Sequence, residues 1–259
     1  MTARQVADPG DYRSLDYRPP ERVRWGLPAA LVPLAFFALL PLLLPALSAI
    51  GLSPSGWGRL VIGVGAYLLP AAWAVVVARR RGLGSLRRDF GLAFRPVDLA
   101  IGLAAAIGVE LIRLLIGVVL VSVTPERPTP NVQVSDSVAG NVALAVIAIG
   151  IAPVVEELLM RGMLLRALRN ALLRRRPEPS EARRHWATDA SVLLSAAVFT
   201  ALHLHEAPDL VTAVTLTLAV FPMGLVVGWL ATRTGRLGPG IVTHALVNGL
   251  ALALALTLR

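Results

Sequence analysis

The chain has 259 residues, of which 56% are hydrophobic and only 16% are charged, and its mean hydropathy is +0.68. Charged residues make up about a quarter of an ordinary soluble domain, so this composition excludes that class and predicts a membrane protein. The formal net charge is +9, and all 25 basic residues are arginines that gather at the ends of apolar stretches. This pattern is typical of the connections of a membrane protein and not of a nucleic-acid surface, so we expect no nucleic acid as a partner. Because the chain has no cysteine, it has no disulfide, thiol nucleophile or thiolate metal site.

The first 26 residues carry acidic and arginine side chains and no apolar core, so they do not form a cleavable signal peptide. We expect residues 1–26 to be a disordered cytoplasmic tail. Residues 27–258 are expected to form a single transmembrane domain.

The rest of the chain contains apolar stretches about 20 residues long, the length that crosses about 30 Å of hydrocarbon. They predict an all-α, polytopic membrane bundle of about seven helices, within a range of six to eight. Prolines 28, 33, 41 and 45 fall in the first stretch and predict that it is kinked. The expected spans are 27–49, 57–78, 97–123, 140–168, 187–206, 210–231 and 238–258.

The orientation of these spans follows from the arginines. Arginine-rich connections lie at 79–95, 166–184 and, more weakly, 233–236, whereas the connections at 50–56, 124–139 and 207–209 are nearly free of arginine. Cytoplasmic connections of membrane proteins are enriched in basic residues. The alternation predicts a multi-pass membrane protein with its N-terminus in the cytoplasm and its C-terminus outside.

Ionisable side chains inside a membrane span are costly, so each of them indicates either a function or a pairing partner. Glu110 and Arg113 are three residues apart on one helix, where they can neutralise each other. We therefore interpret them as a structural pair.

The segment from Pro153 to Arg161 is more informative. Adjacent residues on a helix point about 100° apart, so Glu156 and Glu157 cannot address one point, whereas Glu157 and Arg161 share a face. Glu156 is then left without a partner, and an unpaired carboxylate in a low-dielectric site suits a general base. The alternative, that both carboxylates belong to a solvated ion network at the helix end, has about equal support from the spacing.

Histidines fall in two later spans. His203 follows Phe199 by four residues and shares its face, while His205 points elsewhere and is expected at the rim of the bundle. His244 and Asn248 share a face of the last span, where two neutral donors could stabilise an oxyanion. The alternatives are a hydrogen-bonded core histidine for His203 and an interhelical clamp for His244 and Asn248.

The depth of these residues in their spans is only partly consistent. Counted from the arginine-rich ends of the expected spans, Glu156 is about 15 Å deep, His203 about 24 Å and His244 about 9 Å. The three groups can meet if the helices tilt or their starts shift by a turn or two.

Glu156-Glu157-x-x-x-Arg161, Phe199-x-x-x-His203 and His244-x-x-x-Asn248 resemble, in this order, the three motifs of the CPBP family. That family contains CAAX prenyl endopeptidases, bacteriocin-processing proteins and the Abi proteins. The resemblance covers about residues 140–255. It implies an intramembrane endopeptidase whose catalytic chamber opens toward the cytoplasm.

The resemblance also implies roles for the residues. Glu156 and His203 would activate water, and His244 and Asn248 would form the oxyanion hole. The supporting residues would be Glu157, Arg161 and Phe199. No cofactor is expected, and the partners would be membrane lipid and a peptide or membrane-protein substrate, which could be lipidated.

Three alternatives remain open. Glu156, His203 and His244 could instead hold a zinc ion with a water ligand, although the chain lacks a His-Glu-x-x-His motif. The same buried residues could relay protons in a transporter, which should show repeated halves. The fold could also serve as a non-catalytic membrane scaffold or immunity protein.

Overall fold

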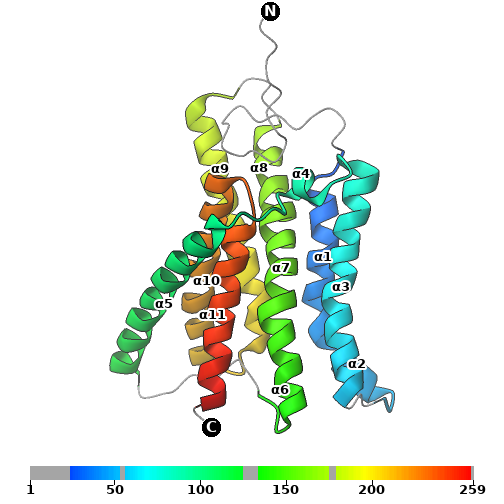
Figure 1. Ribbon diagram of the computed structural model, residues 1–259, viewed down its shortest axis with the longest axis vertical. Coiled ribbons are helices and arrows are strands. Elements are labelled where there is room, and N and C mark those ends of the chain that lie inside the picture. The colour runs from blue at the N-terminus through cyan, green and yellow to red at the C-terminus, as the bar shows by residue number, and fades with distance from the viewer. Residues whose placement is uncertain (1–23, 53–55, 125–133, 175–178, 258–259) are drawn as a thin grey trace, which may run out of the picture.

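The computed structural model describes residues 24–52, 56–124, 134–174 and 179–257, and throughout these ranges the regular structure is helical (Figure 1). The elements are α1 (Leu27–Leu39), η1 (Leu40–Leu42), α2 (Leu43–Ala49), α3 (Gly56–Arg81), α4 (Leu86–Phe90), α5 (Val97–Val123), α6 (Val138–Ala145), η2 (Val146–Ile151), α7 (Ala152–Glu157), η3 (Leu158–Leu164), α8 (Leu165–Leu173), α9 (Glu181–His203), η4 (Leu204–Glu206), α10 (Leu210–Thr234) and α11 (Gly238–Thr257).

The helices are long and apolar enough to cross a membrane, as the sequence predicts. Within the described part of the chain, six stretches meet that length and hydropathy, and α1 with η1 adds a shorter apolar helix, Leu27–Leu42. This is the polytopic helical bundle of about seven helices that we expected. Figure 1 shows the longer helices side by side, with α5 leaning away from the others at its lower end.

The predicted kink of the first span is a change of helix type. A short 3-10 turn, Leu40–Leu42, separates α1 from α2 and has a proline in its first positions. Proline lacks the N–H that an α-helix needs at an interior position. Of the tail predicted at 1–26, residues 1–23 lie outside the described residues, whereas Trp25 is buried.

The arginine-rich connections lie at one end of the bundle. This end, which we call the arginine-rich end, contains the last turn of α3, all of α4, the end of α8, the start of α9 and the turn between α10 and α11, and it is the upper end in Figure 1. The lower end, which we call the opposite end, contains α2, the start of α3, the end of α9 with η4, and the start of α10.

The polar segment just before the span predicted at 187–206 is helical, because α9 begins six residues earlier than that span. The Ser180 side chain accepts a hydrogen bond from the backbone N–H of Arg183, and Glu181 occupies the first turn. A serine cap and an acidic first turn stabilise a helix start even where the sequence is polar. Hydropathy detects the membrane-crossing part of a helix but not its polar extension.

Buried ion pairs and backbone bonds hold the arginine-rich end together. Arg236, in the α10–α11 turn, binds both oxygens of Asp98 on α5, with Nε–Oδ1 and Nε–Oδ2 distances of 2.8 and 3.0 Å. The same turn donates two backbone bonds to the segment between α4 and α5, from Leu237 to Gly91 and from Gly238 to Ala93. Gly91 ends α4 at a φ of +73°, a conformation that favours glycine.

Two other buried side chains make hydrogen bonds at this end. Arg166 is buried on α8 and donates to the carbonyl oxygens of Asp89 and Gly235, each at 3.3 Å. Trp25 lies in the core, where its indole Nε1 donates to the Asp89 carboxylate. The contacts fix α4 and the α10–α11 turn onto α8.

The helix that carries Glu156 and Glu157 is not a uniform α-helix. The two glutamates lie in α7, a short α-helical segment with a π-helical segment on each side, η2 before it and η3 after it. Such wide turns occur often at functional sites, because they rotate side chains and release backbone groups from the regular pattern.

Candidate active site

Glu157 and Arg161 form the ion pair that their spacing predicts. Arg161 Nη1 lies 2.9 Å from Glu157 Oε1, and both side chains are almost fully buried. The other guanidinium nitrogen, Nη2, donates to the Gly224 carbonyl oxygen of α10 at 3.1 Å. The guanidinium carbon lies 4.7 Å from the centre of the Phe199 ring, in cation–π range. Arg161 therefore joins the glutamate helix to α9 and α10.

Glu157 also lies close to the last helix. Its Oε2 has no hydrogen-bond partner among the described residues, and a Cβ placed on Gly240 would lie 3.1 Å from this atom. A side chain at position 240 would therefore press on the carboxylate.

Glu156 is not unpaired, and the sequence-based expectation that it has no partner is wrong. The hydroxyl of Tyr67 on α3 donates to Glu156 Oε1 at 3.2 Å. The prediction failed because Tyr67 is 89 residues away and belongs to no recognisable motif. A phenol in the middle of an apolar span is the one available signal, since a buried tyrosine hydroxyl usually finds a partner.

His244 lies between the two glutamates. Its Nδ1 is 3.2 Å from Glu157 Oε1, and its Nε2 is 3.7 Å from Glu156 Oε2. Arg161 balances one of the two carboxylates, so a single proton on His244 or Glu156 would balance the other. The imidazole thus links the two carboxylates and offers a place where a proton can be held or moved.

His203 presents a free nitrogen to the same region. Its Nδ1 lies 2.8 Å from the Phe199 carbonyl oxygen. A carbonyl oxygen only accepts, so Nδ1 carries the hydrogen and Nε2 of the neutral ring has the lone pair. The Phe199 ring packs edge-on against both imidazoles, with centroid distances of 4.6 Å to His203 and 5.7 Å to His244.

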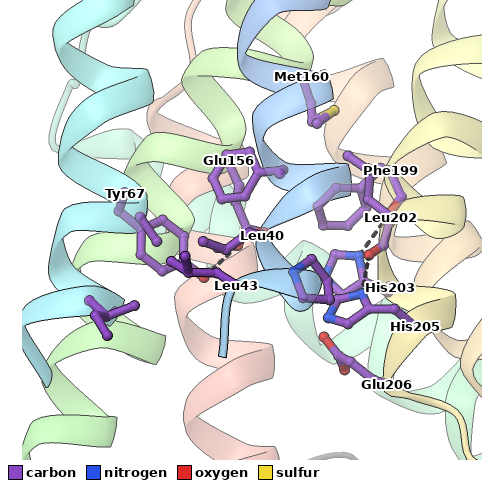
Figure 2. A pocket seen from close by; sticks show the side chains of 15 residues that line it. Leu40, Leu43, Tyr67, Glu156, Met160, Phe199, Leu202, His203, His205 and Glu206 are labelled. Atoms are coloured by element: carbon purple, nitrogen blue, oxygen red, sulfur yellow. Dashed lines mark hydrogen bonds between the residues drawn. The ribbon is translucent and has the colours of Figure 1, made fainter. Parts of the chain in front are cut away.

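Glu156 and His203 line one cavity of about 330 Å³. Figure 2 shows Tyr67 on one side of it and His203, His205 and Glu206 on the other, with Glu156 between them. His205 is exposed, as expected for a rim residue, and its Nδ1 lies 2.7 Å from the Leu202 carbonyl oxygen. The remaining lining residues are mostly apolar: Phe37, Leu40, Pro41, Leu43, Ile62, Gly63, Ala66, Met160, Phe199 and Leu202.

Asn248 has a different environment from the other predicted site residues. Its Nδ2 donates to the Ala148 carbonyl oxygen in η2 at 2.9 Å, and it does not line the cavity. The residue five positions after Ala148 is Pro153, which has no N–H, and the Ala152 N–H already donates to Ile147. Asn248 therefore satisfies a carbonyl group that the irregular helix leaves without a backbone donor.

Two further expectations from the sequence concern a metal site and the pair of Glu110 with Arg113. In the described ranges, no group of three or more His, Asp or Glu side chains is placed to hold a metal ion. Glu110 and Arg113 form the expected pair at 2.9 Å, with 28% and 29% of their side chains exposed. They do not line the cavity.

Comparison with known proteins gives one match. Residues 138–250 match the family described as type II CAAX prenyl endopeptidase Rce1-like. No curated protein and no solved structure matches the chain significantly. The matched residues include the motif residues Glu156, Glu157, Arg161, His203 and His244 of the cluster, whereas Tyr67 lies outside them. Over residues 138–250, this chain is thus similar to the Rce1-like type II CAAX prenyl endopeptidases, the CAAX protease group that its three motifs resemble.

Proposed function

We propose that this protein hydrolyses a peptide bond of a membrane-associated substrate, with Glu156 and His203 activating the attacking water. The observation that carries the proposal is the cavity that Glu156 and His203 share, on two helices long and apolar enough to cross a membrane. Water-filled, polar chambers inside a bundle are where a hydrolytic reaction can take place in a bilayer. A cavity of this size accepts a short, extended stretch of peptide and not a folded domain.

The proposed reaction starts from one water molecule between Glu156 and His203. Glu156 accepts a proton as the water oxygen attacks the scissile carbonyl carbon, and the same proton then passes to the leaving amine. His203 Nε2 orients the water as a hydrogen-bond acceptor. The products are a carboxylic acid and an amine, so the reaction requires no redox partner.

The oxyanion of the tetrahedral intermediate requires donors. We assign His244 and Asn248 to this role, as the motifs suggest, with the second amide hydrogen of Asn248 available because only one is used on Ala148. Glu157 and Arg161 hold His244 and the helix in place through their buried contacts. Tyr67 holds Glu156 from α3.

The test uses purified protein in detergent and a quenched-fluorescent peptide library that includes prenylated members. We expect the wild type to cleave some members and Glu156→Gln to lose cleavage while it remains folded, because the amide cannot accept the proton. The matched control is Glu110→Gln, whose carboxylate is outside the cavity and which should cleave like the wild type.

A chelator arm decides between the metal-free mechanism that we propose and a zinc enzyme. Cleavage that survives chelation supports general-base catalysis by Glu156, and loss with rescue by zinc contradicts it. Absence of cleavage across the library by folded wild type would contradict the proposed endopeptidase activity.

A further inference from the structure

The last turn of α3 and the short helix α4 form a corner that is rich in arginine. We call residues 79–90 the α3–α4 corner. Its single acidic residue, Asp89, is buried. Five of its residues are exposed arginines: Arg79, Arg80, Arg81, Arg87 and Arg88. The corner therefore presents positive charge to its surroundings with no exposed carboxylate of its own beside it.

The backbone of the corner holds the Asp89 carboxylate on the inner side. This carboxylate accepts hydrogen bonds from the backbone N–H groups of Leu83 at 2.9 Å and Ser85 at 3.2 Å, and from the Trp25 indole at 3.2 Å. A Cβ on Gly82 would collide with it, so the turn fits closely around the carboxylate. Because these donors use the one negative charge inside the corner, the arginines are turned outward without a counter-ion from their own segment.

The α3–α4 corner lies where a membrane-crossing helix ends. The apolar part of α3 ends at Ala78, and arginines 79–81 form its last turn. The Gly84 N–H donates to the Ala78 carbonyl oxygen at 2.9 Å, and Arg88 Nη2 donates to the Leu83 carbonyl oxygen at 3.1 Å. These bonds keep α4 beside the end of α3, at the upper end of the bundle in Figure 1. Basic groups directly after an apolar span lie at the level of the phospholipid headgroups.

We propose that the α3–α4 corner binds the headgroup of an anionic phospholipid in the leaflet at the arginine-rich end. Clusters of about four to eight basic residues directly after a membrane span attract anionic lipid. A guanidinium group can donate to two phosphate oxygens at once, which an ammonium group cannot do in the same planar geometry. The charge of the corner and its level in the membrane together select a lipid headgroup as the occupant.

The other charged groups at this end are arranged differently. Arg236 is buried against Asp98, and α9 carries the exposed acidic residues Glu181 and Asp189 among its arginines. Basic residues that only orient the chain in the membrane need no separation from acidic ones at one particular corner. The outward arginines around an inward carboxylate therefore favour a localised binding site over a general excess of charge.

A headgroup at the corner would also steady the helix that carries Glu156. Arg166 of α8 donates to the Asp89 carbonyl oxygen at 3.3 Å. A Cβ placed on Gly162 in η3 would lie 3.0 Å from the Phe90 Cβ, so α4 packs closely on this helix. A ligand that binds the folded corner raises the stability of the folded protein, so the lipid should raise Tm.

The test is native mass spectrometry of the purified protein in a neutral detergent. The protein is titrated with phosphatidylglycerol or with phosphatidylcholine of the same acyl chains. The corner variant is Arg80→Gln with Arg87→Gln. Its matched control is Arg174→Gln with Arg233→Gln, which removes two exposed arginines of the same end from outside the corner. Each variant thus loses two positive charges.

We expect the wild type to bind phosphatidylglycerol more tightly than phosphatidylcholine. The corner variant should bind phosphatidylglycerol roughly thirtyfold more weakly, since each basic residue near the headgroups contributes roughly five- to sixfold. The matched control should stay within about threefold of the wild type. Equal binding of the two lipids by the wild type, or equal losses in the two variants, would overturn the proposal.

Thermal unfolding in the same detergent provides a second readout. Without added lipid, both variants should unfold at the wild-type Tm, because the replaced side chains are exposed. Phosphatidylglycerol should raise the Tm of the wild type and of the control but not of the corner variant, and an equal rise in all three contradicts the site.

A competition arm identifies the source of the phosphate. Glycerol phosphate has the headgroup chemistry without the acyl chains, and it should not displace phosphatidylglycerol from the wild type at equal concentration. Displacement would show that the corner takes a soluble phosphate compound and would overturn the assignment to lipid. None of these measurements depends on peptide cleavage, so the lipid site and the proposed endopeptidase activity can fail separately.

Discussion

Buried polar groups have different surroundings at the two ends of this helical bundle. At the arginine-rich end, Arg236 binds both oxygens of Asp98 and Arg166 donates to two carbonyl oxygens. Beside the cavity, Glu157 Oε2 has no hydrogen-bond partner in the described part of the chain, and His203 bonds through Nδ1. The contacts at the arginine-rich end close the structure, whereas Glu156 and His203 line a cavity that can hold a ligand.

Apolar side chains are also packed more tightly at the arginine-rich end than at the rim of the cavity. The apolar core includes Phe90 and Met163, both fully buried near α4 and η3, whereas η1 and η4, which line the cavity, contain no buried residue. A tightly packed region resists local opening, and sites that admit ligands come from less stable regions. We therefore expect mutations at the arginine-rich end to change stability and mutations around the cavity to change activity.

The largest difference in activity is expected between the variants of two histidines that lie close together where α9 ends. His203→Ala removes the lone pair that faces the cavity and should lower kcat about 10³-fold with little change in Tm. His205→Ala, at the exposed rim, should lower it by about twofold. Kinetics on one cleaved peptide, with thermal unfolding in detergent, would measure both, and an essential His205 with a dispensable His203 would contradict the site.

Arg236→Ala should have the opposite effect, a loss of stability with little change in activity. It leaves the Asp98 carboxylate buried without its counter-ion, which should lower the free energy of unfolding by about 3–5 kcal/mol. The kcat per folded molecule should stay near that of the wild type, since Arg236 does not line the cavity. Replacing both residues, as Asp98→Asn with Arg236→Met, should restore part of the stability.

Substitution of Asn248 tests whether a residue beside the glutamate helix affects stability, activity or both. Asn248→Ala leaves the Ala148 carbonyl without a donor, and we expect a loss of about 1–3 kcal/mol in the free energy of unfolding. If Asn248 also donates to the oxyanion, kcat falls while KM is unchanged. A loss of stability with unchanged kcat would leave the asparagine with a purely structural role.

A smaller loss of activity than for His203→Ala is expected for Tyr67→Phe, which keeps the ring and removes one hydroxyl. Loss of its hydrogen bond to Glu156 should lower kcat about tenfold. The neighbouring ring contact with Phe37, at 5.7 Å between centroids, is retained, so Tm should change little. A shift of the pH–rate profile in Tyr67→Phe, absent in Phe37→Leu, would show that the hydroxyl acts through Glu156.

Much of this arrangement could be predicted from the chain alone, for identifiable reasons. Spans follow from hydropathy, and the Glu157–Arg161 pair follows from helical spacing, because both depend on residues close in sequence. The Tyr67–Glu156 and Asp98–Arg236 contacts join residues 89 and 138 positions apart, and no local pattern reports such distances. The partner of Asn248 depends on a wide helical turn that hydropathy does not reveal.

The wide turns of the glutamate helix have one more consequence. Ser195 of α9 donates to the Met160 carbonyl in η3, and Asn248 of α11 donates to the Ala148 carbonyl in η2. Two neighbouring helices thus bind the backbone of the glutamate helix on both sides of Glu156 along the chain. These bonds lock the helices against sliding past one another. A bilayer of different thickness should then tilt the bundle as a unit. The relative positions of Glu156 and His203 along the bundle therefore depend on the protein and not on the lipid around it.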